Sequence, residues 1–391
     1  MRWEALLQVT TTLSEAADGR DAVRALVDEM TARCDVPPKL ALLFSSPHHT
    51  AAWSEMLAEA ETLLPGCAVV GCSAAGVIGD SHEAEQRIAL AMWTLHIDDL
   101  EVDVLHLRAG DDYRNSEPLQ QLTPPDLAMV FADPMSTDLT ALLPTLDSLW
   151  PEAKVVGGLA SGGAVPGAHG LFAGGRHHRF GAVVVTLRGA ISAEVLVAQG
   201  CRPIGEPMLV TQCEGRLVQK LGEQAPVKLL QELYQALEPR DKELFRHSLF
   251  AGIEMRDVVE YQRGDFLIRQ ITGADPDSGA IRISEEIEPW SVVQFHLRDA
   301  RTSREDLMER LEQAKGVIAP CGALMFTCVG RGLQLYGRPD HDTDLLKEAF
   351  GDVKIGGFFA NGEIGPVAGQ SHLHGYTSVI VLLAATSGAT P

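Results

Sequence analysis

The pattern of apolar residues repeats three times along the chain. Each copy opens with a short, almost continuous apolar run, and the three runs are residues 40–44, 127–131 and 323–326. Such runs are typical of strands in a sheet that is covered on both faces. Apolar residues at helical spacing follow each run. A strand followed by a helix predicts the start of a β–α–β crossover in every copy.

The helices can be placed by their apolar stripes. The first two stripes are Trp53, Met56, Leu57, Ala60 and Leu64, and Leu139, Leu142, Leu143, Leu146 and Trp150. Pro144 interrupts the second stripe, so we expect that helix to start late or to kink there. The third stripe is shorter, over residues 345–350. We expect Asp342 to cap its beginning and Gly351 to end it.

A second strand follows each helix and runs into glycines. The glycine segments are residues 69–76, 155–162 and 354–362. They predict tight turns, each of which leads to a closing strand at residues 88–95, 182–187 or 377–383. Ligands of α/β proteins bind at the carboxyl ends of strands, where glycine lets the backbone approach closely. We therefore expect the three segments to meet around a hollow.

The region between the second and third copies, roughly residues 191–315, has a different pattern. It is rich in short strands, with a helix expected over residues 226–237 and a hairpin turn at Asp275–Gly279. Ser303, followed three residues later by Asp306, predicts a capped helix start. The fold class is thus α/β, with mixed α/β and α+β character. It combines repeated strand–helix–strand–glycine turn–strand units with a β-rich central region.

Composition narrows the class of protein. The chain has 391 residues, 46% hydrophobic and 22% charged, with a formal net charge of −21. This acidity disfavours nucleic-acid binding, because phosphate groups would be repelled. No apolar run reaches the roughly 18 residues of a membrane-spanning helix. The seven cysteines include no Cys-x-x-Cys pair and indicate free thiols in a reducing compartment. We expect a soluble cytoplasmic protein without membrane insertion.

Several segments resemble the FIST family, named for F-box and intracellular signal-transduction proteins. They are residues 69–79 (VVGCSAAGVIG), 205–211 (GEPMLVT), 266–271 with Asp275, and 356–366 (GGFFANGEIGP) followed by His372-Leu373-His374. The similarity runs along almost the whole chain. It implies a FIST N-terminal domain over residues 37–225, with residues 1–36 as its N-terminal segment, and a FIST C-terminal domain over residues 226–391.

The resemblance also implies a function. FIST proteins are regarded as intracellular sensory modules that bind small ligands, and amino acids have been proposed as such ligands. No catalytic residue is firmly assigned in the family. In many relatives the module is fused to a signalling output domain or follows an F-box. About 35 residues precede the first repeat, and only residues 384–391 follow the last. We therefore expect signalling through a separate partner protein.

Glu363 is the most distinctive charge in the sequence. It lies in a predicted tight turn between Gly362 and Gly365, where a carboxylate needs a partner. That partner is either the ammonium group of a ligand or Arg331, and the second case would be a structural ion pair. If an amino acid binds, Arg331 or Arg269 would hold its carboxylate. The residues expected at the ligand site are Cys72, Ser73, Arg269, Cys328, Arg331, Asn361, Glu363 and His374.

Other functions stay open at this point. Cys72 or Cys328 beside a histidine, or Glu363 as an acid or base, would make an enzyme. A protein-binding scaffold without any ligand is a further alternative. Glu363, His372 and His374 have the ligand types of a two-histidine, one-carboxylate metal site, but no helical spacing preorganises them. No phosphate-loop motif occurs. We predict neither a cofactor nor a metal.

Overall fold

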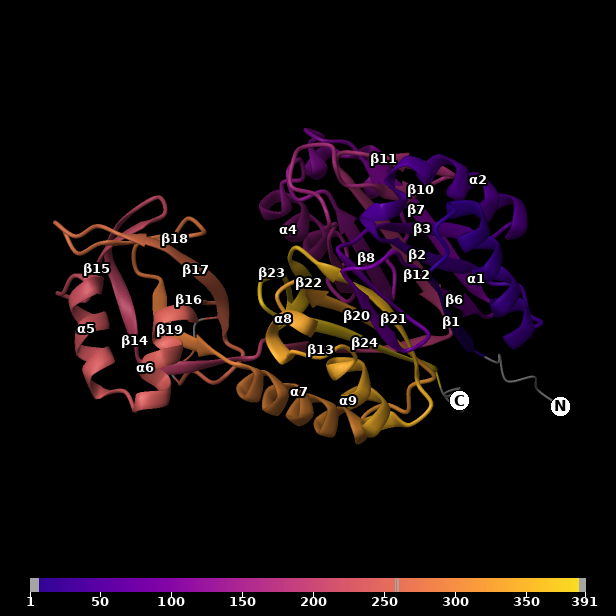
Figure 1. Ribbon diagram of the computed structural model, residues 1–391. Helices are drawn as coiled ribbons and strands as arrows, with labels where there is room; N and C mark the ends of the chain where they lie inside the picture. The colour runs from indigo at the N-terminus through magenta and orange to yellow at the C-terminus, as the bar shows by residue number, and fades with distance from the viewer. Residues whose placement is uncertain (1–6, 257, 259, 387–391) are drawn as a thin grey trace, which may run out of the picture. The chain divides into compact units, whose positions relative to one another are not determined.

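The computed structural model describes residues 7–256, 258 and 260–386 (Figure 1). The chain divides into two compact units. The first combines Met1–Val197 with Glu309–Pro391, and the second is Ala198–Met308. All three repeats lie in the first unit, and we call the second the barrel unit.

In the part of the chain that the structure describes, the first compact unit contains three six-stranded sheets with equivalent strand orders. The first sheet is β1(Gln8–Ser14), β6(Leu90–His96), β2(Leu40–Ser45), β3(Ala68–Ser73), β10(Leu171–Ala173) and β11(Arg176–His178). The second is β7(Leu100–Leu107), β12(Ala182–Gly189), β8(Leu127–Ala132), β9(Lys154–Leu159), β22(Glu363–Val367) and β23(Gln370–His374). The third is β13(Ile191–Ala198), β24(Ser378–Ala385), β20(Gly322–Cys328), β21(Lys354–Ala360), β4(Gly76–Gly79) and β5(His82–Glu85).

Each sheet is built in the same way. The opening strand (β2, β8 or β20) is parallel to the strand after the helix (β3, β9 or β21), as the crossover prediction requires. The closing strand (β6, β12 or β24) is antiparallel to the opening strand on its other side. The three predicted repeats are therefore confirmed, and the protein has a mixed α/β fold.

A hairpin follows the second strand of each repeat and pairs with the sheet of another repeat. Hairpin β4–β5 of the first repeat joins the third sheet, and β10–β11 of the second joins the first sheet. Hairpin β22–β23 of the third repeat joins the second sheet. This cyclic exchange ties the three sheets into one unit.

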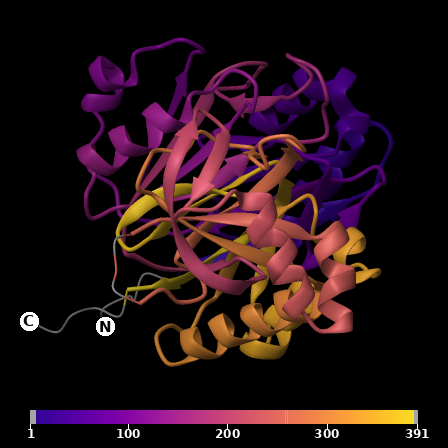
Figure 2. The same ribbon diagram turned by 90° about the vertical axis from the view of Figure 1, so that its left-hand side faces the viewer.

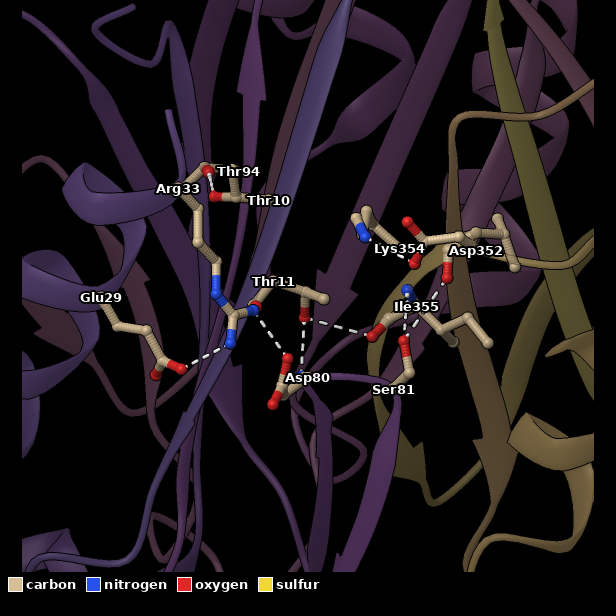
Figure 3. A network of polar contacts seen from close by, with 11 residues as sticks. Thr10, Thr11, Glu29, Arg33, Asp80, Ser81, Thr94, Asp352, Lys354 and Ile355 are labelled. Atoms are coloured by element: carbon tan, nitrogen blue, oxygen red, sulfur yellow. Dashed lines mark hydrogen bonds and ion pairs between the residues drawn. The ribbon is translucent and has the colours of Figure 1, made fainter. Parts of the chain in front are cut away.

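Hydrogen bonds hold the first of these hairpins in place (Figure 3). At its turn, Asp80 donates its backbone N–H to the hydroxyl of Thr11 on β1, and that hydroxyl donates to the carbonyl of Ile355 on β21, 3.1 Å away. Arg33 bonds both the carboxylate of Asp80 and the carbonyl of Thr11, at 2.6 and 2.7 Å. One network thus joins the first and third sheets.

Helices cover the outer faces of the sheets. α1(Gly19–Arg33) and α2(Trp53–Leu63) pack their apolar stripes on the first sheet, side by side in Figure 1. α4(Leu139–Leu149) packs on the second sheet, near the short α3(Glu117–Gln120). The expectation that this helix starts late is wrong, because it begins at Leu139 and runs through Pro144. Asp138 caps it by accepting the N–H of Ala141.

The third repeat carries α8(Gly332–Tyr336) and α9(His341–Phe350). Gly351 ends α9, as predicted, with a positive φ of 69°. The prediction that Asp342 caps α9 is wrong. The cap position is Asp340, and Asp342 lies inside the first turn, where its side chain contacts other charged residues.

The barrel unit is a closed barrel with helices beside it (Figure 2). Its strands are β14(Cys201–Glu214), β15(Leu217–Leu221), β18(Ile281–Ile283), β17(Phe266–Ala274), β16(Leu249–Glu254) and β19(Val292–Arg298). The helices α5(Pro226–Ala236) and α6(Pro239–His247) lie between β15 and β16 in the chain. The predicted turn at Asp275–Gly279 is confirmed, because the Asp275 carboxylate accepts the N–H of Asp277 and the hydroxyl of Ser278.

The helix after the barrel starts earlier than predicted. α7(Ala300–Lys315) begins three residues before Ser303. The carboxylate of Asp299 accepts the N–H of Thr302 at 2.7 Å, which is the capping role expected of Ser303.

Candidate functional site

The glycine segments contain strand residues at the positions where the sequence predicted turns. Gly71, Gly157 and Gly357 lie inside β3, β9 and β21, each opposite a residue of the parallel opening strand. Their φ values are +154°, +135° and +146°. A Cβ atom there would lie about 2 Å from the carbonyl oxygen of the neighbouring strand, at 1.9, 2.1 and 1.9 Å respectively. Glycine is thus required by close approach within each sheet, and the turn assignment at these three positions was wrong.

The three glycine segments meet, as predicted. Ser161 of the second segment donates its N–H to the carbonyl of Ser73 in the first, at 3.1 Å. The hydroxyl of Ser161 donates to the carbonyl of Phe359 in the third segment and accepts the N–H of Ala75, at 2.5 and 2.8 Å. Direct hydrogen bonds therefore join all three segments where the sequence led us to expect a hollow.

Aromatic residues pack in the core of the three sheets. Phe44, Phe131 and Phe326 stand at equivalent positions near the ends of the opening strands, and Phe358 follows Gly357. Phe358 contacts each of the other three, with ring centroids 4.9 to 6.0 Å apart. All four rings are fully buried. The meeting point of the repeats is therefore packed with apolar side chains, and the expectation of a charged hollow at this point is wrong.

Cys72 and Ser73 belong to this packed region. Cys72 is fully buried, and burial raises the pKa of its thiol well above the ordinary value. A raised pKa disfavours the thiolate that a nucleophile or a metal ligand needs. The hydroxyl of Ser73 accepts the N–H of Gly170 at 3.0 Å and donates to the carbonyl of Ser161 at 3.3 Å. Both side chains help to hold the segments together.

The third repeat places the other predicted residues around Glu363. This residue is the first of β22, it is fully buried, and its backbone pairs with His374 of β23. One carboxylate oxygen accepts the N–H of Thr377 at 3.0 Å. Thr377 in turn accepts the N–H of Cys328 through its carbonyl, at 2.9 Å. Glu363 and Cys328 are therefore linked through a single residue.

Arg331 lies at the end of the same chain of contacts. The backbone N–H of Arg331 donates to the carbonyl of Cys328, the last residue of β20, at 2.8 Å. Its guanidinium is fully buried and donates through Nε to Asp342, 2.8 Å away, and through Nη2 to the hydroxyl of Tyr336, also at 2.8 Å. These two bonds orient the plane of the guanidinium. A buried guanidinium just beyond β20 and a buried carboxylate at the start of β22 thus belong to residues joined by one chain of hydrogen bonds, although the two strands lie in different sheets.

Asp342 and Glu83 set the charge balance next to Arg331. Burial acts to raise the pKa of Asp342, but the charges of Arg331 and His341 hold it well below its ordinary value. Glu83 of β5 accepts the N–H groups of Asp342 and Thr343, both at 3.1 Å, through one carboxyl oxygen. Burial, followed by the negative charge of Asp342, raises the pKa of Glu83 to about 8. At neutral pH one of the two carboxyl groups is ionised and the other is largely protonated.

The remaining predicted residues lie in different surroundings. His374 is buried and its Nε2 lies 3.1 Å from the carbonyl of Gly365. Asn361 is exposed, and its side-chain amide donates to the carbonyl of Ala160 at 3.1 Å. Arg269 lies on β17 of the barrel unit, where it forms an ion pair with Glu285. The other seven predicted residues are all in the first compact unit.

Metal binding finds no support in the described part of the chain. Its histidines, cysteines and carboxylates form no group of three or more that could hold a metal ion. The set of Glu363, His372 and His374 considered from the sequence does not assemble as such a site. The rings of the two histidines are 6.1 Å apart.

Two surface cavities lie away from these residues. One, of about 260 Å³, lies at the ends of α1 and α2 and is lined by Cys34, Cys67 and several prolines. The other, of about 380 Å³, lies beside α4 and includes Arg114 and Pro144. No residue predicted for the ligand site lines either of them.

Sequence reasoning missed four residues of the site as partners of the predicted ones: Glu83, Tyr336, Asp342 and Thr377. Asp342 was noticed only as a helix cap. Glu83 is far from the third repeat in sequence and reaches it through the hairpin exchange. Glu83 could have been found only by expecting that the hairpin of one repeat pairs with the sheet of another.

The comparisons with known proteins agree with this architecture. The family model of the FIST N domain matches residues 39–224, and that of the FIST C domain matches residues 226–366. The chain therefore belongs to the FIST family, whose domains are proposed to sense small ligands. The boundary between the two models falls inside the barrel unit, between β15 and α5. A functional division at residue 225 stays a prediction.

Mycobacterial proteins are similar over most of their length. An uncharacterized protein of Mycobacterium tuberculosis is 38% identical over 356 residues, which cover 88% of this chain and 91% of the relative. An uncharacterized protein of Mycobacterium bovis is 35% identical over 354 residues, with 88% and 90% covered. Among the described residues of this chain, none of the helices has the length and apolar character to cross a bilayer.

Proposed function

We propose that this chain is a cytoplasmic, non-catalytic sensory protein that binds a small polar metabolite, an amino acid in the first instance. The ligand would bind beside Glu363 and Arg331 and signal through a separate partner protein. The observation that carries the proposal is the burial of two opposite charges, the Glu363 carboxylate and the Arg331 guanidinium, in residues that one chain of hydrogen bonds joins. Membership of a family of proposed ligand sensors supports the same conclusion.

The two charges match the two ends of an amino acid. A carboxylate such as Glu363 binds an ammonium group, and a guanidinium binds a carboxylate with two parallel hydrogen bonds. Asp342 and Tyr336 hold the guanidinium of Arg331 in one orientation, so little freedom is lost when a ligand binds. Buried charges are costly and cluster at functional sites more often than elsewhere.

The origin of these residues supplies a way to signal. Glu363 and His374 come from hairpin β22–β23, which pairs with the second sheet, whereas Cys328 and Arg331 follow β20 of the third sheet. A ligand that contacts both groups favours the arrangement in which they are close. Binding would then shift the population between two arrangements of the hairpin and the strand ends, and the partner would recognise one of them.

A thermal-shift screen tests the proposal. The purified chain is melted with each standard amino acid and with a panel of other polar metabolites. A ligand present at 100 times its dissociation constant adds about 2.7 kcal/mol to the free energy of unfolding. We expect at least one amino acid to raise the melting temperature of the wild type and to lose this effect in Glu363→Gln. Melting temperatures that stay unchanged across the whole panel would favour the alternative of a scaffold without a ligand.

A matched control separates the loss of binding from a general loss of stability. Glu55 of α2 is an acidic residue of the first compact unit whose side chain is 60% exposed. Glu55→Gln removes a charge outside the proposed site and should keep the ligand-induced shift. A shift that disappears equally in Glu55→Gln and Glu363→Gln would argue against binding at Glu363.

A further inference from the structure

The second repeat has an insertion that the other two lack. In the first repeat only residues 74–75 connect the second strand to the exchanged hairpin, and in the third only residues 361–362. In the second repeat the same connection is eleven residues long, 160–170. The repeat architecture does not need these residues, and a loop added to a rigid scaffold is a common place for a binding function.

The insertion brings His169 onto Asp133. Asp133 directly follows β8, at the carboxyl end of the strand, and both side chains are completely buried. His169 Nδ1 lies 2.9 Å from one carboxylate oxygen of Asp133. The other oxygen accepts the hydroxyl of Ser136 at 2.6 Å and the N–H of Met135 at 3.3 Å. These three contacts fix the position of the Asp133 side chain and orient the imidazole.

The pairing leaves His169 Nε2 as the acceptor of the ring. When Nδ1–H donates to a carboxylate, the neutral imidazole carries its lone pair on Nε2. Nε2 is buried and has no hydrogen-bond partner among the described residues. A buried acceptor without a donor costs on the order of 1–3 kcal/mol. Such an atom is retained more readily where it has a ligand to bind.

The insertion itself lies beside this nitrogen. A Cβ atom on Gly163 would lie 3.1 Å from Nε2, so the backbone of this half-buried glycine packs close to the imidazole ring. The ends of the insertion are fixed, because Ser161 bonds Phe359 and Gly170 bonds Ser73. The exposed Val165 lies between these anchors. Between these anchors Arg179 donates to the carbonyl of Gly167 at 2.8 Å, so this bond has to break for the middle of the loop to move while its ends stay in place.

Exposed apolar side chains lie on the segments around the pair. Met135, Val165 and Phe180 are 47%, 61% and 46% exposed. The backbone N–H of Met135 donates to Asp133. The insertion lies close to Phe180, because a Cβ atom on Gly167 would be 3.2 Å from the ring of Phe180. All three belong to loops at the carboxyl end of the second sheet, where α/β proteins bind ligands. These side chains can contact the apolar part of a small molecule.

We propose that Asp133 and His169 form a second binding site, for a small primary amine with an apolar body. The ammonium group donates a hydrogen bond to His169 Nε2 when residues 162–168 move aside. The negative charge of Asp133, conveyed through the imidazole, favours a cation over a neutral donor. The apolar body lies against Met135, Val165 and Phe180. This site uses none of the residues of the site proposed around Glu363.

Benzylamine serves as the probe, with benzyl alcohol and toluene as controls of the same shape. Isothermal titration of the full chain should show binding of benzylamine, weaker binding of the alcohol and weaker binding still of toluene. Asp133→Asn keeps the shape of the side chain and removes its charge, and should weaken benzylamine binding at least about tenfold. Glu55→Gln is the control outside both sites and should bind benzylamine as the wild type does.

A measurement on the wild type guards against a variant that fails to fold. Diethyl pyrocarbonate modifies accessible neutral imidazoles, and peptide mapping by mass spectrometry locates the modified histidine. We expect His169 to react in the folded protein and benzylamine to slow that reaction. The proposal is overturned if His169 reacts only when the whole chain unfolds. It is equally overturned if Asp133→Asn binds benzylamine as tightly as the wild type does.

Discussion

The protonation of Glu83 gives the sharpest test of the buried charges in the third repeat. Glu83 accepts two N–H groups of the first turn of α9, and only 2% of its surface is exposed. Its pKa is about 8 in the folded protein, against 4.5 for the ordinary side chain. The folded state therefore holds a proton that the unfolded state releases. We expect Glu83→Gln to remove a pH-dependent contribution to stability.

The sign and size of the contribution of Glu83 to the free energy of unfolding follow from proton linkage. A carboxyl group with a raised pKa contributes stability that is fully present below about pH 4.5 and is lost as pH rises to about 8. Inside this window the two states differ by up to one proton, which changes the free energy of unfolding by about 1.4 kcal/mol for each pH unit. Asp342 has a lowered pKa, so its contribution is lost only as pH falls below about 4. The two effects occupy separate pH ranges.

Urea unfolding followed by tryptophan fluorescence measures this effect. Trp53, Trp93 and Trp150 are buried in the first compact unit, whereas Trp290 of the barrel unit is 68% exposed. The fluorescence change therefore reports mainly on the unit that contains Glu83. Between pH 5 and 7.5 the stability of the wild type relative to Glu83→Gln should fall by about 1.4 kcal/mol per pH unit.

The comparison has its own control. Histidines that titrate near neutral pH are present in both proteins, so their contributions cancel in the difference. Gly316→Ala changes no ionisable group and meets no atom nearer than 3.9 Å, so it should give a difference that does not depend on pH. The reasoning is refuted if the wild type and Glu83→Gln show the same pH dependence.

Further predictions concern packing and accessibility. Gly71→Ala should cost more than about 2 kcal/mol, because its Cβ would lie 1.9 Å from a carbonyl oxygen, whereas Gly316→Ala, with nothing nearer than 3.9 Å, should leave the urea midpoint almost unchanged. Ellman's reagent should label the half-buried Cys213 at least about tenfold faster than the fully buried Cys72, and equal rates would contradict this placement. Thr11→Val should cost about 1–2 kcal/mol in the same unfolding assay, because it removes the hydroxyl between β1, β21 and the first hairpin, and an unchanged midpoint would show that the network is dispensable.

The local elements could be read from the sequence because periodicity decides them. The opening strands, their helices and the closing strands all appear within a few residues of their predicted bounds. In α2 every apolar position that marked the helix is buried, from Trp53 to Ala60. The charged helix α6 and strand β16 of the barrel unit were missed. Besides Pro239, the apolar residues of α6 are the adjacent pair Leu244 and Phe245, too few to show a helical repeat.

The arrangement of these elements could not be read in the same way. The glycines were recognised as special, but sequence alone does not distinguish a turn from a strand that lies close to its neighbour. Gly71 is required by the carbonyl of Leu43, a contact between strands that the fold creates. The exchange of hairpins is likewise a choice among pairings that similar short strands all permit.

The candidate site was predicted in part for the same reason. Glu363 and Arg331 stood out because charges beside glycines are unusual. The surroundings of Arg331 are set by tertiary structure: its partner Asp342 stands in the first turn of α9, and Glu83, which bonds the N–H of Asp342, comes from another repeat. The pair of Asp133 and His169 was missed because the two residues lie in different segments that meet only when the insertion folds.

The affinity of the best amino acid from the thermal screen, compared between the wild type and Glu363→Gln by isothermal titration, tests the central claim most directly. The exchange removes the negative charge while keeping the size of a fully buried side chain. We predict that the dissociation constant rises at least about tenfold, as expected for the loss of one charge-assisted hydrogen bond. An unchanged dissociation constant in Glu363→Gln would show that the ligand binds elsewhere and would contradict the account.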